Sequence, residues 1–445
     1  MSNQKIVLIL AYDFPPYISV GAQRPYSWYN YLNEHGFYPI IITRQWANNY
    51  GNNLDYIAPG DSKKAIIKKT DTGSIIQSPY KPNLSNRLLL KYGKNRFRVL
   101  RKLITAYFEV MQWFFICGPK KEVYKHAKSY LKQNKVYIII ASGEPFILFR
   151  YASLLSKKFK TKWIADYRDP WSQNKSRSSN SFLKKLNHYN EKKYVSTSSH
   201  ITTVTEFFSY QIQNIIKSKK ISIVPNGYDI NSLKSLESVK QKSDSLNIGF
   251  VGTIYPWNPI EAFLRVISKL IDKGLSIKLN LYGINNTDEV KEIATSNFPK
   301  LLNHICFFEK IEYKIIMEKL AENNVLLLFN YYSFIGTKIY DYLAAQRLIL
   351  LCFENDAIAN KLKADHFILP DHNWNNKNLQ ANLLTETQSG IFINDISMLE
   401  TVIEDLNNDL KQKGYVECIP KNIDKYSRQE QTKKLVNVIN NVIGS

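Results

Sequence analysis

The sequence has little that would tie it to a disulfide scaffold, a structural metal or a membrane span. It holds only four cysteines in 445 residues, and they lie far apart, without the Cys-x-x-Cys spacing of a zinc or redox site. No apolar run approaches the roughly 20 residues that a membrane-spanning helix needs. The first apolar run, Ile6–Leu10, is too short for the core of a secretory signal, and two prolines follow it closely. A reducing, cytoplasmic location is therefore expected.

Acidic residues are also scarce, at 38 against 60 lysines and arginines, which leaves a formal net charge of +22. Such an excess favours anionic partners: nucleotides, phosphates, nucleic acid or an acidic membrane surface. The alternative for the dispersed lysines is a coding bias, because a lysine-rich and asparagine-rich composition also follows from an AT-rich genome. No RNP, zinc-finger or helix-turn-helix signature accompanies the charge, so nucleic acid is not expected as a partner.

Two α/β domains are expected, because the length suits two cores and short apolar runs alternate with amphipathic segments throughout. In the first half the expected strands are 6–10, 38–43, 136–141, 162–166, 200–204 and 221–224. In the second half they are 247–251, 278–282, 304–307, 325–329 and 348–353. Helices are expected between them, including 24–35, 146–159, 206–217, 260–273 and 340–346. Alternation of this kind predicts βαβ units and parallel sheets.

The expected domains are residues 1–229 and 246–426, with a polar linker at 230–245 after the turn sequence Pro225-Asn226-Gly227. The last amphipathic helix, 427–445, is expected to fold back on the first domain. Open α/β sheets bind ligands beyond the carboxyl ends of their strands. Two such domains therefore predict a site in the cleft between them.

Charged residues follow one expected strand directly, in the segment Trp163-Ile-Ala-Asp-Tyr-Arg-Asp-Pro-Trp171. Asp166, Arg168 and Asp169 stand where a ligand would bind, and Glu144 follows the strand before it. Carboxylates at such an edge can bind sugar hydroxyls or act as general bases, so these four residues are the candidate catalytic residues. The alternative is a salt-bridged corner between strand and helix. Asp166 and Asp169 lack the spacing of a metal-binding Asp-x-Asp pair, so no metal is expected.

Glycine-containing turns follow three other strands and suit contacts between backbone N–H groups and a phosphate. The candidate donor-binding residues are Gly21, Gly252, Thr253, Gly336, Thr337, Lys338 and Asp341. Lys338 and the nearby amides could neutralise a diphosphate, and Asp341 could accept hydrogen bonds from ribose hydroxyls. Further candidates for the cleft are Arg24, Glu206 and Asn226. The alternatives are an ordinary capped helix with a solvated lysine at Lys338, and a helix N-cap at Thr205 with Glu206 in the first turn.

Taken in order, these segments resemble the GT-B glycosyltransferases of the retaining family 4. The matching pieces are Asp13–Pro16 with Gly21 and Arg24, Trp163–Trp171, Thr202–Glu206, Val224–Asp229, Gly249–Thr253 and Gly336–Leu343. They span nearly the whole chain, and the closing helix from Tyr426 resembles the family's crossover helix. The resemblance implies a nucleotide-sugar donor held by the second domain, an acceptor held by the first, and catalysis between them without an obligatory metal or cofactor.

This sequence departs from the family pattern at two places. The usual Glu-x7-Glu pair is incomplete, because Ser333 stands eight residues before Asp341. The arginine and lysine that commonly follow the Gly252-type loop are also missing, since no basic residue occurs there before Arg265. Lys338 is therefore expected to carry more of the phosphate binding.

The segment 84–108 has seven basic residues and no acid, with leucines and aromatics interleaved. Such a composition suits an amphipathic helix on an anionic membrane, and equally a helix that packs its apolar face on the first domain. The sequence thus favours a cytoplasmic or peripheral membrane glycosyltransferase that transfers sugar to a carbohydrate or lipid-linked saccharide in surface-polysaccharide synthesis. The alternatives are another GT-B enzyme, such as a nucleotide-sugar epimerase or hydrolase, and a non-catalytic basic binding protein.

Overall fold

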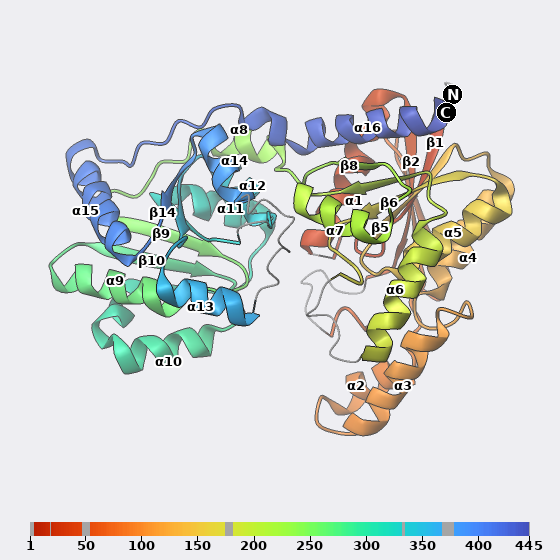
Figure 1. The fold of residues 1–445 in the computed structure, drawn as a ribbon, viewed down its shortest axis with the longest axis horizontal. Helices are drawn as coiled ribbons and strands as arrows, with labels where there is room; N and C mark the ends of the chain where they lie inside the picture. Colours follow the sequence, from red (N-terminus) through yellow and green to blue (C-terminus); the bar gives the residue numbers. More distant parts are fainter. Residues whose placement is uncertain are drawn as a thin grey trace. The chain divides into compact units, whose positions relative to one another are not determined.

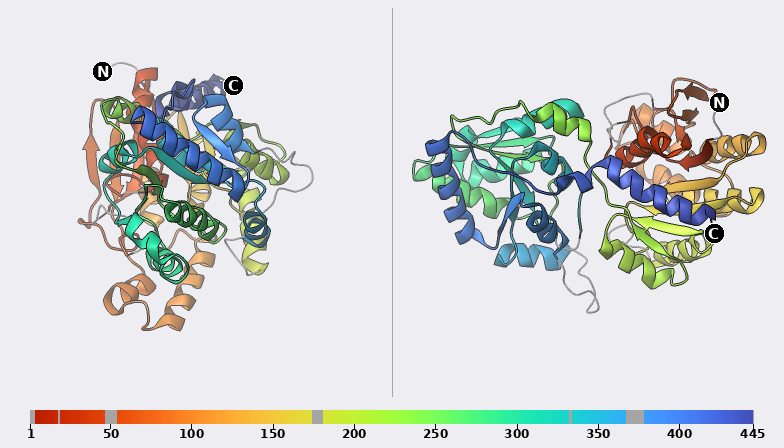
Figure 2. Two further views of the ribbon diagram at one scale, coloured as in Figure 1. Left: turned by 90° about the vertical axis from the view of Figure 1, so that its left-hand side faces the viewer. Right: turned by 90° about the horizontal axis from the view of Figure 1, so that it is seen from above.

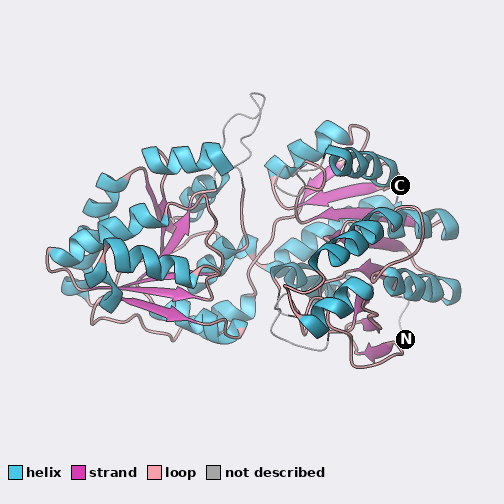
Figure 3. Ribbon diagram, turned by 90° about the horizontal axis from the view of Figure 1, so that it is seen from below, coloured by secondary structure: helices cyan, strands magenta, loops and turns pink. Residues whose placement is uncertain are grey.

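The computed structural model describes residues 4–17, 19–46, 54–173, 181–331, 334–366 and 378–444. The chain divides into two compact units, one formed by Met1–Pro225 with Arg428–Ser445 and the other by Asn226–Ser427. In each unit a sheet lies between layers of helices, as Figure 3 shows for each separately. This is the two-domain α/β architecture predicted from the alternation of strands and helices.

The first unit is built on an eight-stranded sheet in the order β3-β4-β2-β1-β5-β6-β7-β8 (Figure 1). Neighbouring strands run parallel except β3 and β4, which are antiparallel. The strands are β1 (Lys5–Leu10), β2 (Phe37–Arg44), β3 (Ile66–Lys69), β4 (Ser74–Ser78), β5 (Ile138–Gly143), β6 (Lys162–Tyr167), β7 (His200–Thr203) and β8 (Ile221–Ile223). The strand order reverses between β1 and β5, which makes their carboxyl ends the topological switch point of this sheet.

Helices cover both faces of this sheet, and the helix at the end of the chain is one of them. They are α1 (Val20–Tyr31), η1 (Leu32–His35), α2 (Leu84–Tyr92), α3 (Arg98–Met111), α4 (Lys121–Gln133), α5 (Ile147–Phe159), α6 (Ser181–Val195), α7 (Glu206–Ile215) and α16 (Arg428–Gly444). Figure 2 shows α16 beside α1. Leu435 and Ile439 of α16 are buried with Val7 and Ile9 of β1, so apolar packing holds the end of the chain on this unit.

Successive residues of β1 serve two separate cores. Val7 and Ile9 belong to the core that includes α16, whereas Leu8 and Leu10 belong to the core on the opposite face. A strand covered by helices on both sides must be apolar at every position. This explains why the run Ile6–Leu10 shows no alternation of polar and apolar residues in the sequence.

The second unit is built on a six-stranded parallel sheet in the order β11-β10-β9-β12-β13-β14. The strands are β9 (Leu246–Val251), β10 (Ile277–Tyr282), β11 (Ile305–Phe308), β12 (Val325–Phe329), β13 (Leu348–Cys352) and β14 (Gly390–Ile393). The helices are α8 (Ile230–Leu236), α9 (Ile260–Asp272), α10 (Thr287–Asn297), η3 (Pro299–His304), α11 (Tyr313–Glu322), α12 (Lys338–Ala345), α13 (Ala357–His366), α14 (Leu379–Thr387), α15 (Ile396–Lys413) and η4 (Ile423–Tyr426). Its switch point lies between β9 and β12, the same position as in the Rossmann order.

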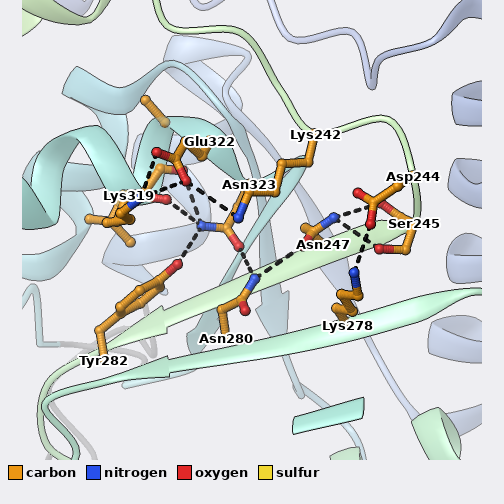
Figure 4. Close-up of polar contacts among 12 residues, drawn as sticks. Lys242, Asp244, Ser245, Asn247, Lys278, Asn280, Tyr282, Lys319, Glu322 and Asn323 are labelled. Atoms are coloured by element: carbon orange, nitrogen blue, oxygen red, sulfur yellow. Dashed lines mark hydrogen bonds and ion pairs between the residues drawn. The ribbon is translucent and has the colours of Figure 1, made fainter. Parts of the chain in front are cut away.

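A network of asparagines ties β9 and β10 to the residue that follows α11 (Figure 4). The Asn280 side-chain amide donates to the side-chain oxygens of Asn323 at 2.8 Å and Asn247 at 3.2 Å. Asn323 in turn donates to the carbonyl of Lys319 at 2.6 Å. Buried polar groups are stable only when they are hydrogen-bonded, so this network fixes α11 on the sheet.

The predicted strands and helices occur within a few residues of their expected bounds, with two corrections. The expected linker 230–245 begins with α8, whose Leu236 is buried in the core of the second unit, so the division falls at Asn226 instead. The basic segment 84–108 forms parts of two helices, α2 and α3, because the glycine-containing turn 93–97 interrupts it. Strands β3, β4 and β14 were not predicted, because each is short and carries polar residues or glycine.

Candidate functional site

Asp166, predicted as a catalytic residue, is fully buried at the end of β6. Its carboxylate accepts hydrogen bonds from Arg24 at 2.7 Å, from the Thr202 hydroxyl at 2.8 Å and from the Ser142 hydroxyl at 3.0 Å. These partners come from α1, β7 and β5. A carboxylate enclosed in this way has no free side to offer a substrate, so the geometry gives Asp166 a positioning role in place of the predicted contact.

Arg24, predicted to line the cleft, is the partner of this buried carboxylate. Its guanidinium also donates to the carbonyls of Val224 at 2.6 Å and Pro225 at 3.1 Å, and only 6% of the residue is exposed. One charged pair thus joins α1, β6 and the segment after β8. Buried ion pairs are tolerated when every donor and acceptor is satisfied, as here. Arg24 fixes the carboxyl-terminal edge of the sheet and does not face solvent.

Arg168 lies across the switch point of the first sheet. Its guanidinium donates to the carbonyl of Gly143 at 2.9 Å and to that of Glu144 at 2.6 Å. It also packs directly on Gly21, where an added Cβ would lie 1.5 Å from Nη1. Any larger residue at this position in the first turn of α1 would displace the Arg168 guanidinium. The structure connects Gly21, predicted as a donor contact, with Arg168, predicted as catalytic.

The carboxylate of Asp13 also lies at this edge, although the sequence analysis did not select it as a site residue. Its Oδ2 is 3.8 Å from Nη2 of Arg168 and accepts a hydrogen bond from the Ser19 hydroxyl at 3.4 Å. Its Oδ1 is buried and finds no hydrogen-bond partner in the described part of the chain. Burial raises the pKa of the Asp13 carboxyl above its usual range, although Arg168 lowers it and Glu144 adds to the rise. The signal in the sequence was an acid directly after the first strand.

The other predicted residues of the first unit lie around this group. Glu144 and Asp169 are exposed, after β5 and β6 respectively. Glu206 is exposed in the first turn of α7, where the Thr205 hydroxyl accepts a hydrogen bond from the N–H of Phe208 and caps the helix. This supports the capping alternative for that segment. Asn226, predicted as a cleft residue, begins the second unit.

Aromatic packing anchors the segment around Arg168 and Asp169. Trp171 is stacked on Phe146 with ring centroids 5.0 Å apart and on Trp113 at 5.2 Å. The Tyr167 hydroxyl donates to the buried Glu191 at 2.9 Å. The charged strand end therefore rests on a rigid apolar base, which keeps the exposed carboxylates in a defined place.

Lys338 lies at the start of α12 in the second unit, near the switch point. Its Nζ is buried and has no hydrogen-bond partner among the described residues, and it lies 3.7 Å from the centroid of the Phe250 ring. Part of the side-chain stem remains exposed, but the amine itself does not contact solvent. Burial lowers the pKa of the Lys338 amine to about 7. The Lys338 amine is thus buried at a helix N-terminus, in cation–π contact with the Phe250 ring and without a hydrogen-bond partner in the described structure.

Gly252 forms the turn after β9, beside Lys338. Its φ of +85° is in the left-handed region, which glycine adopts without strain. An added Cβ would lie 3.8 Å from Cε of Lys338, and the N–H of Gly252 donates to the carbonyl of Tyr282 at 2.9 Å. Thr253 follows and is partly exposed. The turn and the lysine thus form one group of predicted donor residues.

The remaining donor residues surround the start of α12. Gly336 and Thr337 precede Lys338, and the Thr337 side chain makes no capping hydrogen bond to the helix. Asp341, one turn further on, accepts a hydrogen bond from the Tyr313 hydroxyl at 2.8 Å. Ser333, which stands in place of the family's first acid, lies outside the described residues. The structure brings Gly252 and Lys338 together and places Asp341 in the same helix.

An aromatic pair occupies the loop where the common basic residues are missing. The rings of Tyr255 and Trp257 are stacked with centroids 4.6 Å apart, and Tyr331 meets Tyr255 edge-on at 6.1 Å. No lysine or arginine occurs in the sequence between Gly252 and Arg265. Among the described residues, no group of three or more His, Cys, Asp or Glu side chains could hold a metal ion.

The fold and the topology of both sheets define the class: the chain has the GT-B fold. Its structure is similar to sucrose-phosphate synthase from Thermosynechococcus elongatus, with a TM-score of 0.63, 12% identity and coverage of 99% of this chain and 100% of that one. It is also similar to a glycosyltransferase from Rickettsia africae, with a TM-score of 0.56, 15% identity and coverage of 99% of each chain. A third similar structure is the catalytic domain of starch synthase IV from Arabidopsis thaliana, with a TM-score of 0.58, 12% identity and coverage of 100% of each chain. No protein-family model and no curated protein matches the sequence.

Proposed function

We propose that the protein is a glycosyltransferase that moves a sugar from a nucleotide-sugar donor to a carbohydrate or lipid-linked saccharide acceptor. The observation that carries the proposal is the Nζ of Lys338, a buried amine without a hydrogen-bond partner in the described structure, at a helix N-terminus. Burial of an unpaired amine is unfavourable, and a diphosphate would supply the missing partner. Selection for ligand binding accounts for a feature that folding alone disfavours.

In this proposal the second unit binds the donor through Gly252, Thr253, Gly336, Thr337, Lys338 and Asp341. Lys338 holds its proton when the diphosphate is bound and stabilises the charge that develops on it as the glycosidic bond breaks. Asp341 accepts hydrogen bonds from ribose hydroxyls. The solved structure of starch synthase IV is described as bound to ADP and acarbose, and a trehalose-6-phosphate structure from E. coli as bound to UDP-2-fluoro glucose. These ligands support a nucleotide-sugar donor here, and we propose that no metal or other cofactor is obligatory.

The first unit is proposed to bind the acceptor through the exposed carboxylates Glu144 and Asp169 and through Arg168. Asp13 joins this group because Arg168 contacts both it and the backbone at Glu144. Asp166 and Arg24 hold the strand ends in place beneath it. Carboxylates of this kind accept hydrogen bonds from sugar hydroxyls, and one of them is suited to act as a base.

The ordered motifs support the finer part of the proposal. They resemble the retaining family 4, so we propose transfer with retention and a role in the synthesis of a surface polysaccharide. A lipid-linked acceptor would lie at the inner face of the cytoplasmic membrane, and we propose that the protein acts there as a peripheral enzyme. No helix of the described structure is long and apolar enough to cross a bilayer.

A thermal-shift screen against nucleotide sugars tests the donor assignment, because a ligand that binds only the folded state raises the midpoint by mass action. A specific donor should stabilise the wild type and the control Lys314→Ala, an exposed lysine of the same unit. It should fail to stabilise Lys338→Ala, and turnover of that variant should fall by at least 100-fold, roughly the loss of one oxyanion-type donor. Near-normal turnover in Lys338→Ala would contradict the assignment of the donor site to this lysine.

Assays with the nucleotide sugar that stabilises the protein distinguish the alternative functions. Efficient conversion of the donor without any acceptor would identify an epimerase or a hydrolase instead of a transferase. Stabilisation by no nucleotide sugar, together with salt-sensitive binding of nucleic acid, would identify a basic binding protein.

A further inference from the structure

The hairpin of α2 and α3 carries an exposed apolar surface that takes no part in the proposed donor and acceptor sites. The two helices are joined through the Ser85 hydroxyl, which donates to the carbonyl of Arg101 at 3.0 Å and lies 2.9 Å from the Thr105 hydroxyl. Rings of Tyr92 and Phe97 meet at 5.3 Å at the turn between the helices. The hairpin is therefore an ordered element with a defined outer face (Figure 1).

One row of α3 is apolar and open to solvent. Val99, Leu103 and Tyr107 are 72%, 64% and 58% exposed, and their spacing of four residues places them on the same side of the helix. Phe114 and Phe115, just beyond the helix, are 60% and 65% exposed. No residue of α3 is buried, although it has many apolar side chains. Contiguous exposed apolar surface of this kind marks an interaction site.

The hairpin is also rich in exposed cations, and the single acid of α3, Glu109, lies 3.8 Å from the amine of Lys120. The segment 84–108 contains seven basic residues, and six of them are exposed: Arg87, Lys91, Lys94, Arg96, Arg98 and Lys102. The seventh, Arg101, donates to the carbonyls of Arg96 and Lys94 and fixes the turn. The hairpin thus presents exposed apolar side chains together with exposed cations, and a partner that matches both is apolar and carries negative charge.

We propose that this α3 surface, the exposed side chains of 84–108 with Phe114 and Phe115, lies on an anionic lipid bilayer. Acyl chains match the apolar row, and lipid phosphates match the cations. A helix of 14 residues is about 21 Å long, too short to span a bilayer, so it lies in the plane of the headgroups. Nucleic acid would match the cations but not the apolar row. A second copy would bring the same cations against each other, which costs free energy.

The inference deepens the peripheral membrane role in the proposed function by naming the surface that binds the bilayer, and vesicle binding tests it without a nucleotide sugar or an acceptor. Full-length protein is sedimented with vesicles of phosphatidylglycerol and phosphatidylcholine at a ratio of about 3 to 7, and with phosphatidylcholine alone. Binding should require the anionic lipid and weaken at high salt. The double variant Arg98→Gln/Lys102→Gln should lose about 25-fold in partitioning, at about fivefold or 1 kcal/mol per cation. The control Lys157→Gln/Lys158→Gln changes the net charge equally and should bind like the wild type.

A second test variant and its matched control address the apolar row Val99, Leu103 and Tyr107. Leu103→Glu should reduce partitioning by about tenfold, whereas Ile419→Glu, at a side chain that is 69% exposed in the second unit, should leave it unchanged. Equal binding to neutral vesicles, or equal losses in each variant and its control, would overturn the inference. A change of oligomeric state in Leu103→Glu without vesicle binding would identify a second copy as the partner. If the protein binds vesicles but no nucleotide sugar stabilises it, the membrane-binding role of the α3 surface would be supported and the proposed glycosyltransferase function would be contradicted.

Discussion

Replacing Lys338 by methionine should make the empty protein more stable while it abolishes nucleotide binding. The Lys338 amine is buried against Phe250, and burial lowers its pKa to about 7. In the unfolded chain the amine has an ordinary pKa near 10.5. Methionine keeps a similar length and an apolar stem, so it removes the buried amine without leaving a large cavity. A residue retained for ligand binding should thus reduce stability in the absence of the ligand.

The size of the effect and its pH dependence follow from the two pKa values. Below pH 7 both states hold the proton, and the charged amine costs the native state about 5 kcal/mol, at about 1.4 kcal/mol for each of the 3.5 pH units between them. Between pH 7 and 10.5 the native state releases the proton and the unfolded state keeps it. Stability of the wild type therefore rises with pH relative to Lys338→Met. The advantage of the variant should fall to about 2 kcal/mol at pH 9.

Denaturant unfolding of both proteins at pH 6.5 and pH 9, without ligand, measures this difference. Intrinsic fluorescence and circular dichroism report the transition, and the second unit is expected to shift because it contains Lys338. A variant that is less stable than the wild type, or an advantage that does not change with pH, would refute the buried and unpaired state of the amine. Loss of stabilisation by the nucleotide sugar in the same variant would show that one group causes both effects.

Two further predictions concern the first unit. Asp166→Asn should destabilise it by about 3–5 kcal/mol, because the Arg24 guanidinium stays buried beside a neutral partner. Calorimetry should show an unfolding midpoint lower by roughly 6–20 °C. A loss of stability below about 1 kcal/mol would contradict the structural role of this ion pair. Gly21→Ala should displace the Arg168 guanidinium and reduce transfer by at least tenfold with little change in the unfolding midpoint. Gly444→Ala, where the added methyl meets no atom within 4 Å, is the control, and equal activity of the two variants would contradict the contact.

The strand pattern could be predicted because helices cover both faces of each sheet. Nearly every position of such a strand is then buried: all of Val325–Phe329 is buried, and all of Ile6–Leu10 except the half-buried Ile6. Both runs therefore stand out as continuous apolar segments. The same pattern did not predict β3, β4 and β14. β3 has one half-buried and three exposed residues, and it is a strand because it pairs with β4, which lies beside β2 in the sheet. Pairing partners of this kind are not encoded in a local pattern.

The site could be predicted only as a set of candidate residues. Charged groups after buried strands predicted that the candidates lie at one edge of a sheet, since parallel strands bring their carboxyl ends together. The sequence did not distinguish Asp166 from Glu144, because both follow apolar runs. Burial and hydrogen bonding separate them: Asp166 is fully enclosed, whereas Glu144 is exposed. Asp13 was not predicted as a site residue, because its neighbour Arg168 lies far away in the sequence and only the fold brings the two side chains together.

The two α/β units, the strand ends that carry the candidate residues, the excess of positive charge and the scarcity of cysteines follow from the sequence alone. Those features depend on periodicity and composition, which are local or additive. Tertiary structure alone decided which charges are paired. It buried Asp166 with Arg24, placed Arg168 against Gly21, buried the Lys338 amine against Phe250 without a hydrogen-bond partner in the described structure, and left the apolar row of α3 exposed. Each of these depends on neighbours from distant segments, because desolvation and pairing are set by the residues that fold against a side chain.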